Sequence, residues 1–324
     1  MPEMAIRDAL REAIRAEMLI NDKVFVMGED VGAYGGSYGV TKGLQEEFGI
    51  DRIIDTPISE LGFVGAGIGA AMAGMKPVVE IMTINFSFLA LDQIINSASK
   101  IHYMSGGQIT VPVIIRMASG GGLALGAQHS HSFEGWYAHI PGIKVACPSN
   151  PYDAKGLLKA AFMDNNPVVF IEYTAHYGLR GEVPDEDYYV PFGQAKLVRE
   201  GKDVTIIGYS GSVMLAEKAA AILAEEDGID AEVIDLRTLR PLDMETVLAS
   251  VKKTNRAVVV ESAFRFGGFA GEIATQIQEQ AFDYLDAPIG RVAGVEVPMP
   301  YTTVLERAAM PDEHQVVEAV RALF

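Results

Sequence analysis

Cysteine, tryptophan and basic residues are scarce in this sequence. Of its 324 residues one is cysteine and one is tryptophan, and 26 lysines and arginines stand against 43 aspartates and glutamates. A single cysteine excludes an internal disulfide framework and any metal site built from several cysteines. Cys147 ends the apolar run KVAC before Pro148, which indicates a buried structural residue rather than a catalytic thiol.

The excess of acidic residues gives a formal net charge of −17. Such a chain would repel the phosphates of nucleic acids, so we expect no nucleic-acid partner. No apolar run is long and uninterrupted enough to span a bilayer, so we expect no membrane partner either. The chain opens with an amphipathic, partly acidic segment that is unlike a signal or transit peptide, and we therefore expect a cytoplasmic protein.

Strand-like and helix-like segments alternate along the chain. Apolar residues at Ile6, Leu10, Ala13, Ile14 and Met18 mark one face of an opening helix. This alternation predicts parallel βαβ units with helices on both faces of a sheet. The β-rich runs of the first part are residues 24–27, 52–55, 77–81, 111–116, 143–147 and 167–173.

A segment rich in glycine, proline and acidic residues interrupts the pattern after Tyr173. We place an extended linker at residues 181–200, between a first domain at 1–180 and a smaller one at 201–324. The fold class is therefore α/β with two domains, as a chain of this length favours. The second domain should contain strands at 204–210, 231–236 and 256–262 and helices at 213–226, 243–253 and 271–281.

Residues 65–70 (GAGIGA) fit the GxGxxA pattern of dinucleotide-binding loops, and Glu80 follows at a distance suited to a ribose contact. Such a loop needs its glycines in the tight turn directly after a strand, whereas residues 56–60 fill that turn here. The glycines therefore predict a helix face that packs closely against another helix. A nicotinamide-dependent dehydrogenase stays an alternative.

Glu60 lies just beyond the carboxyl end of a predicted strand, at the start of a helix, where α/β folds place ligands. A carboxylate there also interacts favourably with the helix N-terminus without any catalytic role. The residues alone leave both interpretations open.

Three long segments of the sequence match a known family in order, and such a match is more specific than any short motif. They are residues 55–80, 85–107 and 127–158. Together with GEDVG (28–32), LDAP (285–288) and VPMPY (297–301), they resemble the β subunit of thiamine-diphosphate-dependent 2-oxoacid dehydrogenase first components, with pyruvate dehydrogenase as the nearest branch. The resemblance implies a transketolase-like pyrimidine-binding domain followed by a transketolase C-terminal domain. It also implies oxidative decarboxylation of a 2-oxo acid and transfer of the acyl group to a lipoyl group.

The resemblance assigns roles to individual residues. Glu60 matches the carboxylate that hydrogen-bonds the aminopyrimidine ring of the cofactor, and Phe86 matches the aromatic residue that stacks on it. Ile58 and Met82 match positions that line the same pocket. His129 matches the active-site histidine that moves protons during acyl transfer, a task that suits histidine near neutral pH. Core packing for Phe86 and a local hydrogen bond for His129 are the structural alternatives.

A structural potassium site, present in some family members, is implied at Asp164 and Asn166. Its other ligands would be the backbone carbonyls of Val113, Ala161 and Phe162. Oxygen ligands suit a hard cation. An Asx turn at the end of the preceding helix explains Asp164 and Asn166 equally well, and both interpretations stay open.

No GDG segment occurs in the sequence. Enzymes of this cofactor class use that segment to bind the magnesium ion that holds the diphosphate. The resemblance therefore implies a magnesium-binding α subunit in an α2β2 heterotetramer, with thiamine diphosphate shared between α and β, and a lipoyl acyltransferase core as a further partner. Acetoin and branched-chain 2-oxo acids are alternative substrates, and a catalytically silent assembly subunit is the alternative that is not an enzyme.

Overall fold

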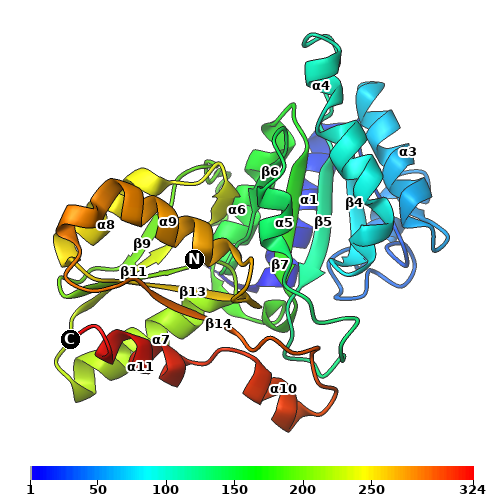
Figure 1. Ribbon diagram of the computed structural model, residues 1–324. Coiled ribbons are helices and arrows are strands. Elements are labelled where there is room, and N and C mark those ends of the chain that lie inside the picture. The colour runs from blue at the N-terminus through cyan, green and yellow to red at the C-terminus, as the bar shows by residue number, and fades with distance from the viewer. Residues whose placement is uncertain (1) are drawn as a thin grey trace. The chain divides into compact units, whose positions relative to one another are not determined.

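Two compact units make up the protein, whose computed structural model describes residues 2–324 (Figure 1). The first unit comprises residues 2–119 and Trp136–Phe192, and the second comprises Gly120–Gly135 and Gly193–Phe324. The chain thus leaves the first unit over Gly120–Gly135 and returns to it before the second unit continues. Each unit has a sheet with helices, so the predicted α/β class is confirmed.

A parallel sheet forms the centre of the first unit. Its strands lie in the order β6, β7, β5, β4, β2 and β3, and neighbouring strands run parallel. Every residue of β2, β5 and β7 is buried, as expected for a parallel sheet with both faces covered. The strands span Lys144–Ala146 (β6), Val168–Tyr173 (β7), Ile114–Ser119 (β5), Lys76–Thr83 (β4), Val24–Gly28 (β2) and Ile53–Asp55 (β3).

Three main helices cover the two faces of this sheet; they span Ile6–Ile20 (α1), Pro151–Met163 (α6) and Glu60–Met72 (α3). The core beneath α1 and α6 contains Val26 and Val78. Gly67 of α3 instead faces Val79, which points to the opposite side because side chains alternate along a strand. Helix α3 therefore lies on the other face from α1 and α6.

Helix α1 buries the apolar face that the sequence predicts. Its buried side chains include Ile6, Leu10, Ala13, Ile14 and Met18. Full burial of a large aliphatic side chain contributes roughly 1.5–3 kcal/mol, so this face anchors α1 against α6 and the sheet.

Helix α6 begins as the sequence predicts. The Oδ1 atom of Asn150 accepts a hydrogen bond from the Asp153 backbone N–H at 2.9 Å, and Pro151 occupies the first helical position. The helix ends at Met163, just before the Asp-Asn-Asn-Pro segment.

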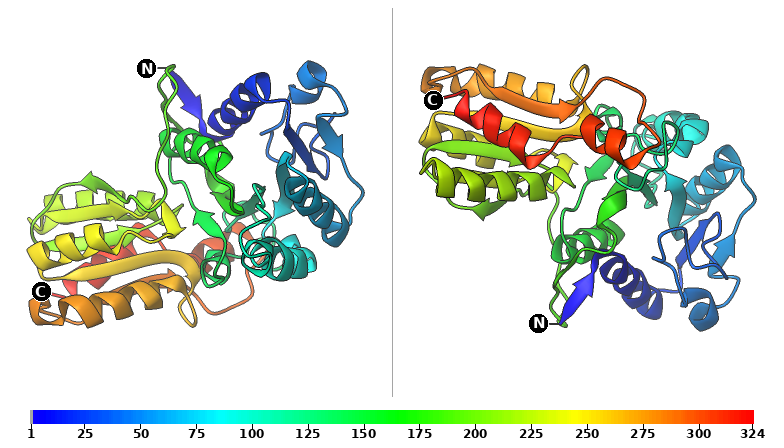
Figure 2. Two further views of the ribbon diagram at one scale, coloured as in Figure 1. Left: turned by 90° about the horizontal axis from the view of Figure 1, so that it is seen from above. Right: turned by 90° about the horizontal axis from the view of Figure 1, so that it is seen from below.

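Shorter elements complete the first unit. Strand β1 pairs antiparallel with β8, so the start of the chain lies beside residues 180–182 (Figure 2). Among the described residues, no helix combines the length and the apolar character that crossing a bilayer requires. The shorter elements are β1 (Glu3–Ala5), α2 (Leu44–Phe48), η1 (Phe86–Ala90), η2 (Gln93–Ala98), α4 (Ile101–Met104), α5 (Glu134–Ala138), η3 (Thr174–His176) and β8 (Arg180–Glu182).

A buried ion cluster links three strands of the first sheet. The Arg116 guanidinium, 1% exposed, donates to Glu80 Oε2 at 2.6 Å and to Glu172 Oε1 and Oε2 at 2.7 and 2.8 Å. The Tyr177 hydroxyl also donates to Glu172 Oε2, at 2.6 Å. Removing one partner from such a cluster leaves a buried charge unpaired, which typically costs about 3–5 kcal/mol.

The sheet of the second unit is mostly parallel. Its strands lie in the order β14, β13, β10, β11 and β9, and only β9 runs antiparallel to its neighbour. Helices α8 and α9 contact each other on one side of the sheet, and α7 and α11 contact each other on the other side (Figure 1). The strands span Lys196–Arg199 (β9), Val204–Gly208 (β10), Ala231–Asp235 (β11), Ala257–Phe264 (β13) and Gly290–Gly294 (β14).

The helices of the second unit match the predicted ones closely. Helix α7 was expected at residues 213–226 and spans Ser212–Glu226, and α9 was expected at 271–281 and spans Phe269–Ala281. The remaining elements are β12 (Thr238–Arg240), α8 (Met244–Thr254), η4 (Phe282–Tyr284), α10 (Thr303–Ala309) and α11 (Glu313–Arg321).

The segment predicted as a linker, residues 181–200, contains regular structure at both ends. Strand β8 extends to Glu182, and β9 begins at Lys196. Between them Val183 and Val190 are buried, and Val190 packs into the core of the first unit. The polar composition of this segment did not predict that these two valines would be buried.

Candidate active site

Several polar side chains lie at the carboxyl edge of the first sheet. Strands β2 and β3 are parallel neighbours, with Gly28 opposite Asp55. Glu29 follows β2 directly, and Glu60 begins α3 after a short turn that follows β3. Both carboxyl groups therefore belong to the edge at which open α/β sheets bind ligands.

Glu60 and Glu29 are both buried, with residue exposures of 3% and 8%. Burial raises the pKa of the Glu29 carboxyl above its usual value, and the negative charge of Glu60 raises it further. A carboxyl group that is buried beside a negative charge favours its protonated form, so Glu29 keeps its proton to a higher pH than an exposed glutamate does. Glu60 also lies in the first turn of α3, where the helix N-terminus favours negative charge.

Three buried polar atoms at this edge have no hydrogen-bond partner among the described residues: Glu29 Oε1, Thr56 Oγ1 and Thr83 Oγ1. They follow or end the adjacent strands β2, β3 and β4. Buried polar atoms are nearly always hydrogen-bonded, so unpaired atoms gathered at one sheet edge mark a place for a polar ligand.

The apolar residues expected to line the cofactor pocket differ in exposure. Phe86 is the first residue of η1 and is half-buried, and Met82 in β4 is also half-buried. Ile58, in the turn before Glu60, is 83% exposed. Core packing therefore does not account for Ile58, and Phe86 is only half-buried.

His129 groups with the second unit, whereas Glu60, Ile58, Met82 and Phe86 all belong to the first. It is half-buried in a loop that is closed by a hydrogen bond from the Gly120 N–H to the His131 carbonyl at 2.8 Å. Gly122 and Gly126 in this loop have φ angles of +104° and +80°, which favour glycine. The His129 N–H donates to the Gly126 carbonyl at 3.2 Å.

Glu306 of α10 holds this loop in place. Its side chain accepts hydrogen bonds from the Gly122 N–H at 2.9 Å and from the Ala124 N–H, at 3.1 Å to one oxygen and 2.9 Å to the other. Glu306 is 2% exposed, and Ala124 has a φ of +55°. Charge-assisted bonds to backbone N–H groups are among the stronger ones, so they can stabilise a strained loop.

A second histidine lies close to His129. Burial lowers the pKa of His131, and the charge of His129 lowers it further. The His131 ring also packs against Phe133, with ring centroids 4.6 Å apart. Both effects favour the neutral form of the His131 ring.

The predicted potassium ligands are found near two ammonium groups. Lys144 Nζ forms an ion pair with Asp164, and Lys76 Nζ donates to the Phe162 carbonyl at 2.5 Å. Asp164 Oδ1 accepts from the N–H and the side-chain amide of Asn166 at 2.9 and 3.0 Å, which is an Asx turn.

The two backbone carbonyls that complete the predicted potassium site are also engaged. The Val113 carbonyl accepts from the Val168 N–H at 2.9 Å, and the Ala161 carbonyl accepts from the Asp164 N–H at 3.2 Å. With two ammonium groups already on Asp164 and Phe162, these residues as arranged do not fit a potassium ion.

The dinucleotide pattern is excluded by the structure. Residues 65–70 lie in the middle of α3 and not in a turn. Glu80, the supposed ribose contact, is buried in the ion cluster with Arg116. The expectation that the glycines pack against another helix is correct only in part: Gly65 faces Gln93 of η2, but Gly67 faces Val79 of strand β4.

Comparison with known proteins also divides the chain into two parts. A family model described as the transketolase pyrimidine-binding domain matches residues 2–178, and one described as the transketolase C-terminal domain matches residues 193–316. Over its full length the chain is 52% identical to the pyruvate dehydrogenase E1 component subunit beta of Rhizobium meliloti and covers 70% of that protein. The chain belongs to the pyruvate dehydrogenase E1 β-subunit family.

Further relatives cover the chain equally well. The corresponding subunit of Rickettsia felis is 50% identical over 98% of each chain. The mitochondrial beta-1 subunit of Arabidopsis thaliana is 54% identical over 98% of this chain and 88% of its own length. A solved structure titled "Split gene transketolase, inactive beta4 tetramer" covers 99% of this chain and 98% of its own, with a TM-score of 0.81 at 24% identity, which shows the shared fold.

The carboxyl edge fits the aminopyrimidine ring that the E1 β family would hold there. Glu60, Met82 and Phe86 all fall within the match to the pyrimidine-binding domain. A buried carboxyl group can share a proton with a ring nitrogen, and the unpaired Thr56 and Thr83 hydroxyls can bond polar ring substituents. The half-buried Phe86 ring offers a surface for stacking.

Two residues of the candidate site were missed by sequence reasoning. Glu29 stands in the GEDVG segment, directly after a strand, and the rule that ligands bind at the carboxyl ends of strands could have identified it. Glu306 gives no such signal, because it lies 184 residues from Gly122 and only the fold brings the two together.

Proposed function

We propose that the chain is the β subunit of a 2-oxoacid dehydrogenase first component that decarboxylates pyruvate oxidatively and transfers the acyl group to a lipoyl group. The observation that carries this proposal is the buried pair Glu29 and Glu60 at the carboxyl edge of the sheet, within the match to the pyrimidine-binding domain. The relatives named pyruvate dehydrogenase E1 component subunit beta, at about half identity, support the substrate class.

Each site residue then has a task. Glu60 would hold the aminopyrimidine by sharing a proton with a ring nitrogen, and Phe86 would stack on that ring with Ile58 and Met82 beside it. Thiamine diphosphate, when bound, supplies the electron sink for the loss of carbon dioxide. His129 would move a proton as the acyl group passes to the lipoyl group.

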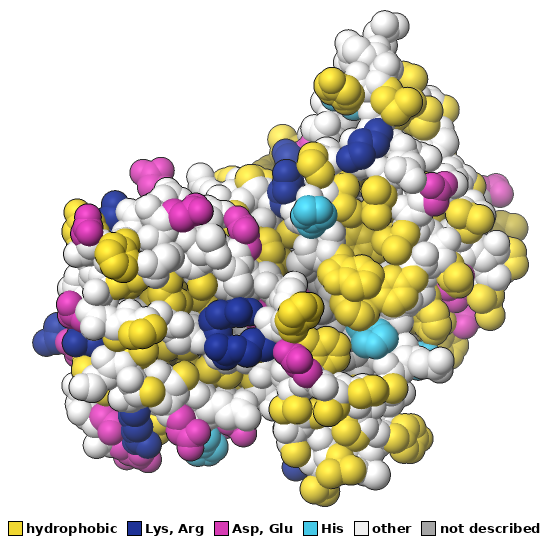
Figure 3. Space-filling model, in the orientation of Figure 1, with side chains coloured by type: hydrophobic (Ala, Val, Ile, Leu, Met, Phe, Trp, Pro, Cys, Tyr) yellow, Lys and Arg dark blue, Asp and Glu magenta, His cyan; other side chains and the backbone are white. Residues whose placement is uncertain are grey.

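The proposal includes an α subunit, in an α2β2 assembly, that binds magnesium and the diphosphate. The first unit leaves large apolar side chains in solvent at the start of α3 and in η1, which contacts α3: Ile58, Leu61 and Leu89 are 83%, 51% and 61% exposed. Trp136, stacked on Phe88, is 52% exposed. Figure 3 shows hydrophobic side chains gathered over this unit. Contiguous apolar surface of this kind marks a partner interface.

The second proposed partner is the lipoyl acyltransferase core. We also propose a cytoplasmic location. The two domains would meet at a linker around residues 181–200. Limited proteolysis would test whether residues 184–195, between β8 and β9, are accessible as a linker.

The test is an assay of the chain reconstituted with its α subunit. Pyruvate, branched-chain 2-oxo acids and acetoin should be compared, and pyruvate should give the highest kcat/KM. The variant Glu60→Gln should lose at least about a hundredfold in turnover, the usual effect of removing a positioned acid–base group. Glu46→Gln, which removes an exposed carboxyl of the same unit, is the matched control.

Two results would overturn parts of the proposal. Higher activity with acetoin or a branched-chain substrate would change the assigned substrate. Wild-type exchange of the thiazolium proton in Glu60→Gln would remove the assigned role of Glu60, and no activity with any of the three substrates would favour a silent assembly subunit.

A further inference from the structure

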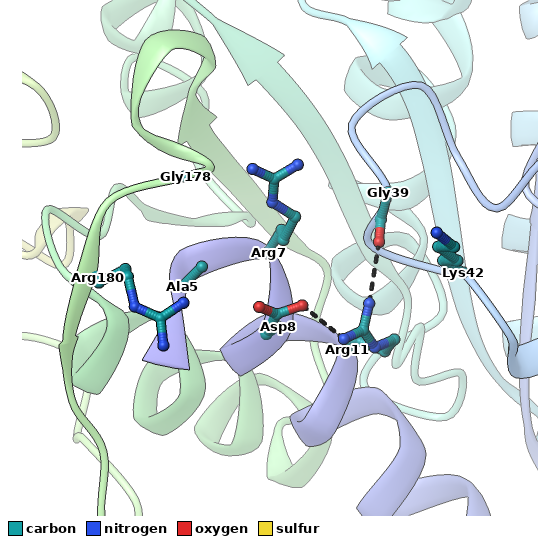
Figure 4. A pocket seen from close by; sticks show the side chains of 8 residues that line it. All are labelled: Ala5, Arg7, Asp8, Arg11, Gly39, Lys42, Gly178 and Arg180. Carbon is teal, nitrogen blue, oxygen red and sulfur yellow. Dashed lines mark hydrogen bonds and ion pairs between the residues drawn. The ribbon is translucent and has the colours of Figure 1, made fainter. Parts of the chain in front are cut away.

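A pocket of about 810 Å³ in the first unit is lined by four basic side chains. Arg7 and Arg11 come from the first two turns of α1, Lys42 from the loop before α2, and Arg180 from β8. Figure 4 shows them around one hollow, with Asp8 between Arg180 and Arg11. Four basic groups together are unusual in a chain whose net charge is −17.

Two of these basic groups lack a partner. Neither the Arg7 guanidinium nor the Lys42 ammonium group has a hydrogen-bond acceptor or a carboxylate in contact among residues 2–324. Both side chains are exposed. Unneutralised charges that face one hollow attract anions, and the walls of the hollow concentrate that field.

The other two basic groups are oriented by the protein. Arg11 donates to Asp8 Oδ1 at 2.5 Å and to the Gly39 carbonyl at 3.3 Å, and both bonds are drawn in Figure 4. Arg180 donates to the Glu3 carbonyl at 3.0 Å. These bonds use part of each guanidinium fork and leave other N–H groups of the fork for a ligand.

Two glycines keep the space around Arg7 open. A Cβ atom on Gly178 would lie 3.2 Å from Arg7 Nη2, and one on Gly39 would lie 3.8 Å from Arg7 Cδ. Gly39 also has a φ of +77°, which other residues rarely adopt. A side chain at position 178 would therefore press on the Arg7 guanidinium, whereas at position 39 it is the positive φ that favours glycine.

We propose that this pocket binds a small phosphorylated metabolite. Arginine forks match phosphate oxygens in a bidentate manner, and lysine adds a mobile point charge. The N-terminus of α1 adds partial positive charge at the same place. A volume of about 810 Å³ lies within the range of pockets that hold small molecules. A nucleic acid is not the expected ligand, because the chain as a whole is strongly acidic.

The test is titration calorimetry of inorganic pyrophosphate into the α2β2 holoenzyme, with the cofactor site first saturated with thiamine diphosphate and magnesium. The wild type should bind the probe, and binding should weaken as salt rises. The double variant Arg7→Gln/Lys42→Gln should bind at least about tenfold more weakly. Lys23→Gln/Lys202→Gln removes two other exposed charges whose ammonium groups contact no carboxylate or carbonyl among the described residues and should bind as the wild type does.

Three outcomes would overturn the proposal: no binding at millimolar pyrophosphate, equal binding by the two double variants, or failure of Arg7→Gln/Lys42→Gln to assemble with α in size-exclusion chromatography. The last outcome would assign the pocket to an acidic segment of a partner chain. The result does not depend on the substrate of the enzyme, so it can fail while the proposed function stands.

Discussion

Glu29 shows how a buried carboxyl group makes stability depend on pH. Its folded-state pKa is raised by burial and by the charge of Glu60. A carboxyl group with a raised pKa stabilises the fold below the unfolded-state pKa, and this contribution is lost as pH rises through the folded-state pKa. Above that point the folded protein carries a costly buried charge.

Glu29→Gln removes that titration while keeping the size of the side chain. Relative to the wild type, the free energy of unfolding of the variant should therefore increase as pH rises from 5 to 8. Thermal or urea unfolding across this range measures the difference. Glu46→Gln, at an exposed position, should give a difference that does not change with pH. Parallel wild-type and Glu29→Gln profiles would contradict the assigned pKa direction.

Glu306 acts on the proposed chemistry only through the loop that carries His129. Glu306→Leu leaves two backbone N–H groups without an acceptor, so acyl transfer to a lipoyl domain should fall at least about tenfold, or 1.4 kcal/mol. Glu306→Gln should restore most of this loss, because a single amide oxygen can accept from both Gly122 and Ala124. Single-turnover acylation of the lipoyl domain is the measurement.

A double variant separates positioning from general destabilisation. If Glu306 works through His129, adding Glu306→Leu to His129→Ala should cause little further loss of acylation. The exposed Glu279→Leu is the control. Additive losses in the double variant would show that Glu306 acts on another step.

At the scale of elements, the end of α6 shows two lysines in contact with predicted potassium ligands. Burial raises the pKa of Asp164, but the hydrogen bonds from Lys144 and Asn166 outweigh it, so the pKa lies below its usual value. A lowered carboxyl pKa gives stability that is present above the unfolded-state pKa and is lost as pH falls through the folded-state pKa.

Because Lys144 and Lys76 already bind Asp164 and the Phe162 carbonyl, the wild type should bind no potassium ion there. Its melting temperature should then be the same in potassium chloride and in sodium chloride. Lys144→Met removes the ammonium group from Asp164, and this variant should lose stability and then gain more from potassium than from sodium. Lys202→Met, at an exposed position in the other unit, is the control. A wild type that melts higher in potassium would show that the ion is bound after all.

Elements that contain an apolar run of their own were predictable, including the short strands β3 and β6. Residues 231–236 and 243–253 were expected as a strand and a helix, and β11 and α8 occupy Ala231–Asp235 and Met244–Thr254. Their apolar periodicity extends far enough to be recognised. Strands such as β1 and β8, of three residues each, depend on partners that are distant in sequence and leave no periodic signal.

The same limit applies to the candidate site. Glu60 was identified from its place after a strand and from a long family resemblance. The bonds from Lys76 to Phe162 and from Gly122 to Glu306 span 86 and 184 residues, and only the tertiary structure reveals them. Local sequence therefore predicts which residues take part in the chemistry, but it does not predict the hydrogen bonds that hold their surroundings.

At the scale of the whole molecule, we expect the isolated chain to bind thiamine diphosphate negligibly, because the diphosphate and magnesium would be held by α. Calorimetry with the cofactor and magnesium should show no binding to the purified chain and tight binding after α is added. Tight, magnesium-dependent binding by the chain alone would contradict the shared-site proposal.

The path of the chain between the two units limits how the protein can be divided. Gly120–Gly135 groups with the second unit, and Trp136–Phe192 returns to the first, so no single cut separates them. A gene fragment that ends at Phe192 would encode the His129 loop without Glu306, and a fragment that begins at Gly193 would encode Glu306 without its amide donors. If either fragment were exchanged between relatives, the His129 loop would come from one protein and residue 306 from another. Recombination within this gene should therefore be tolerated only where the loop and Glu306 are inherited from the same parent.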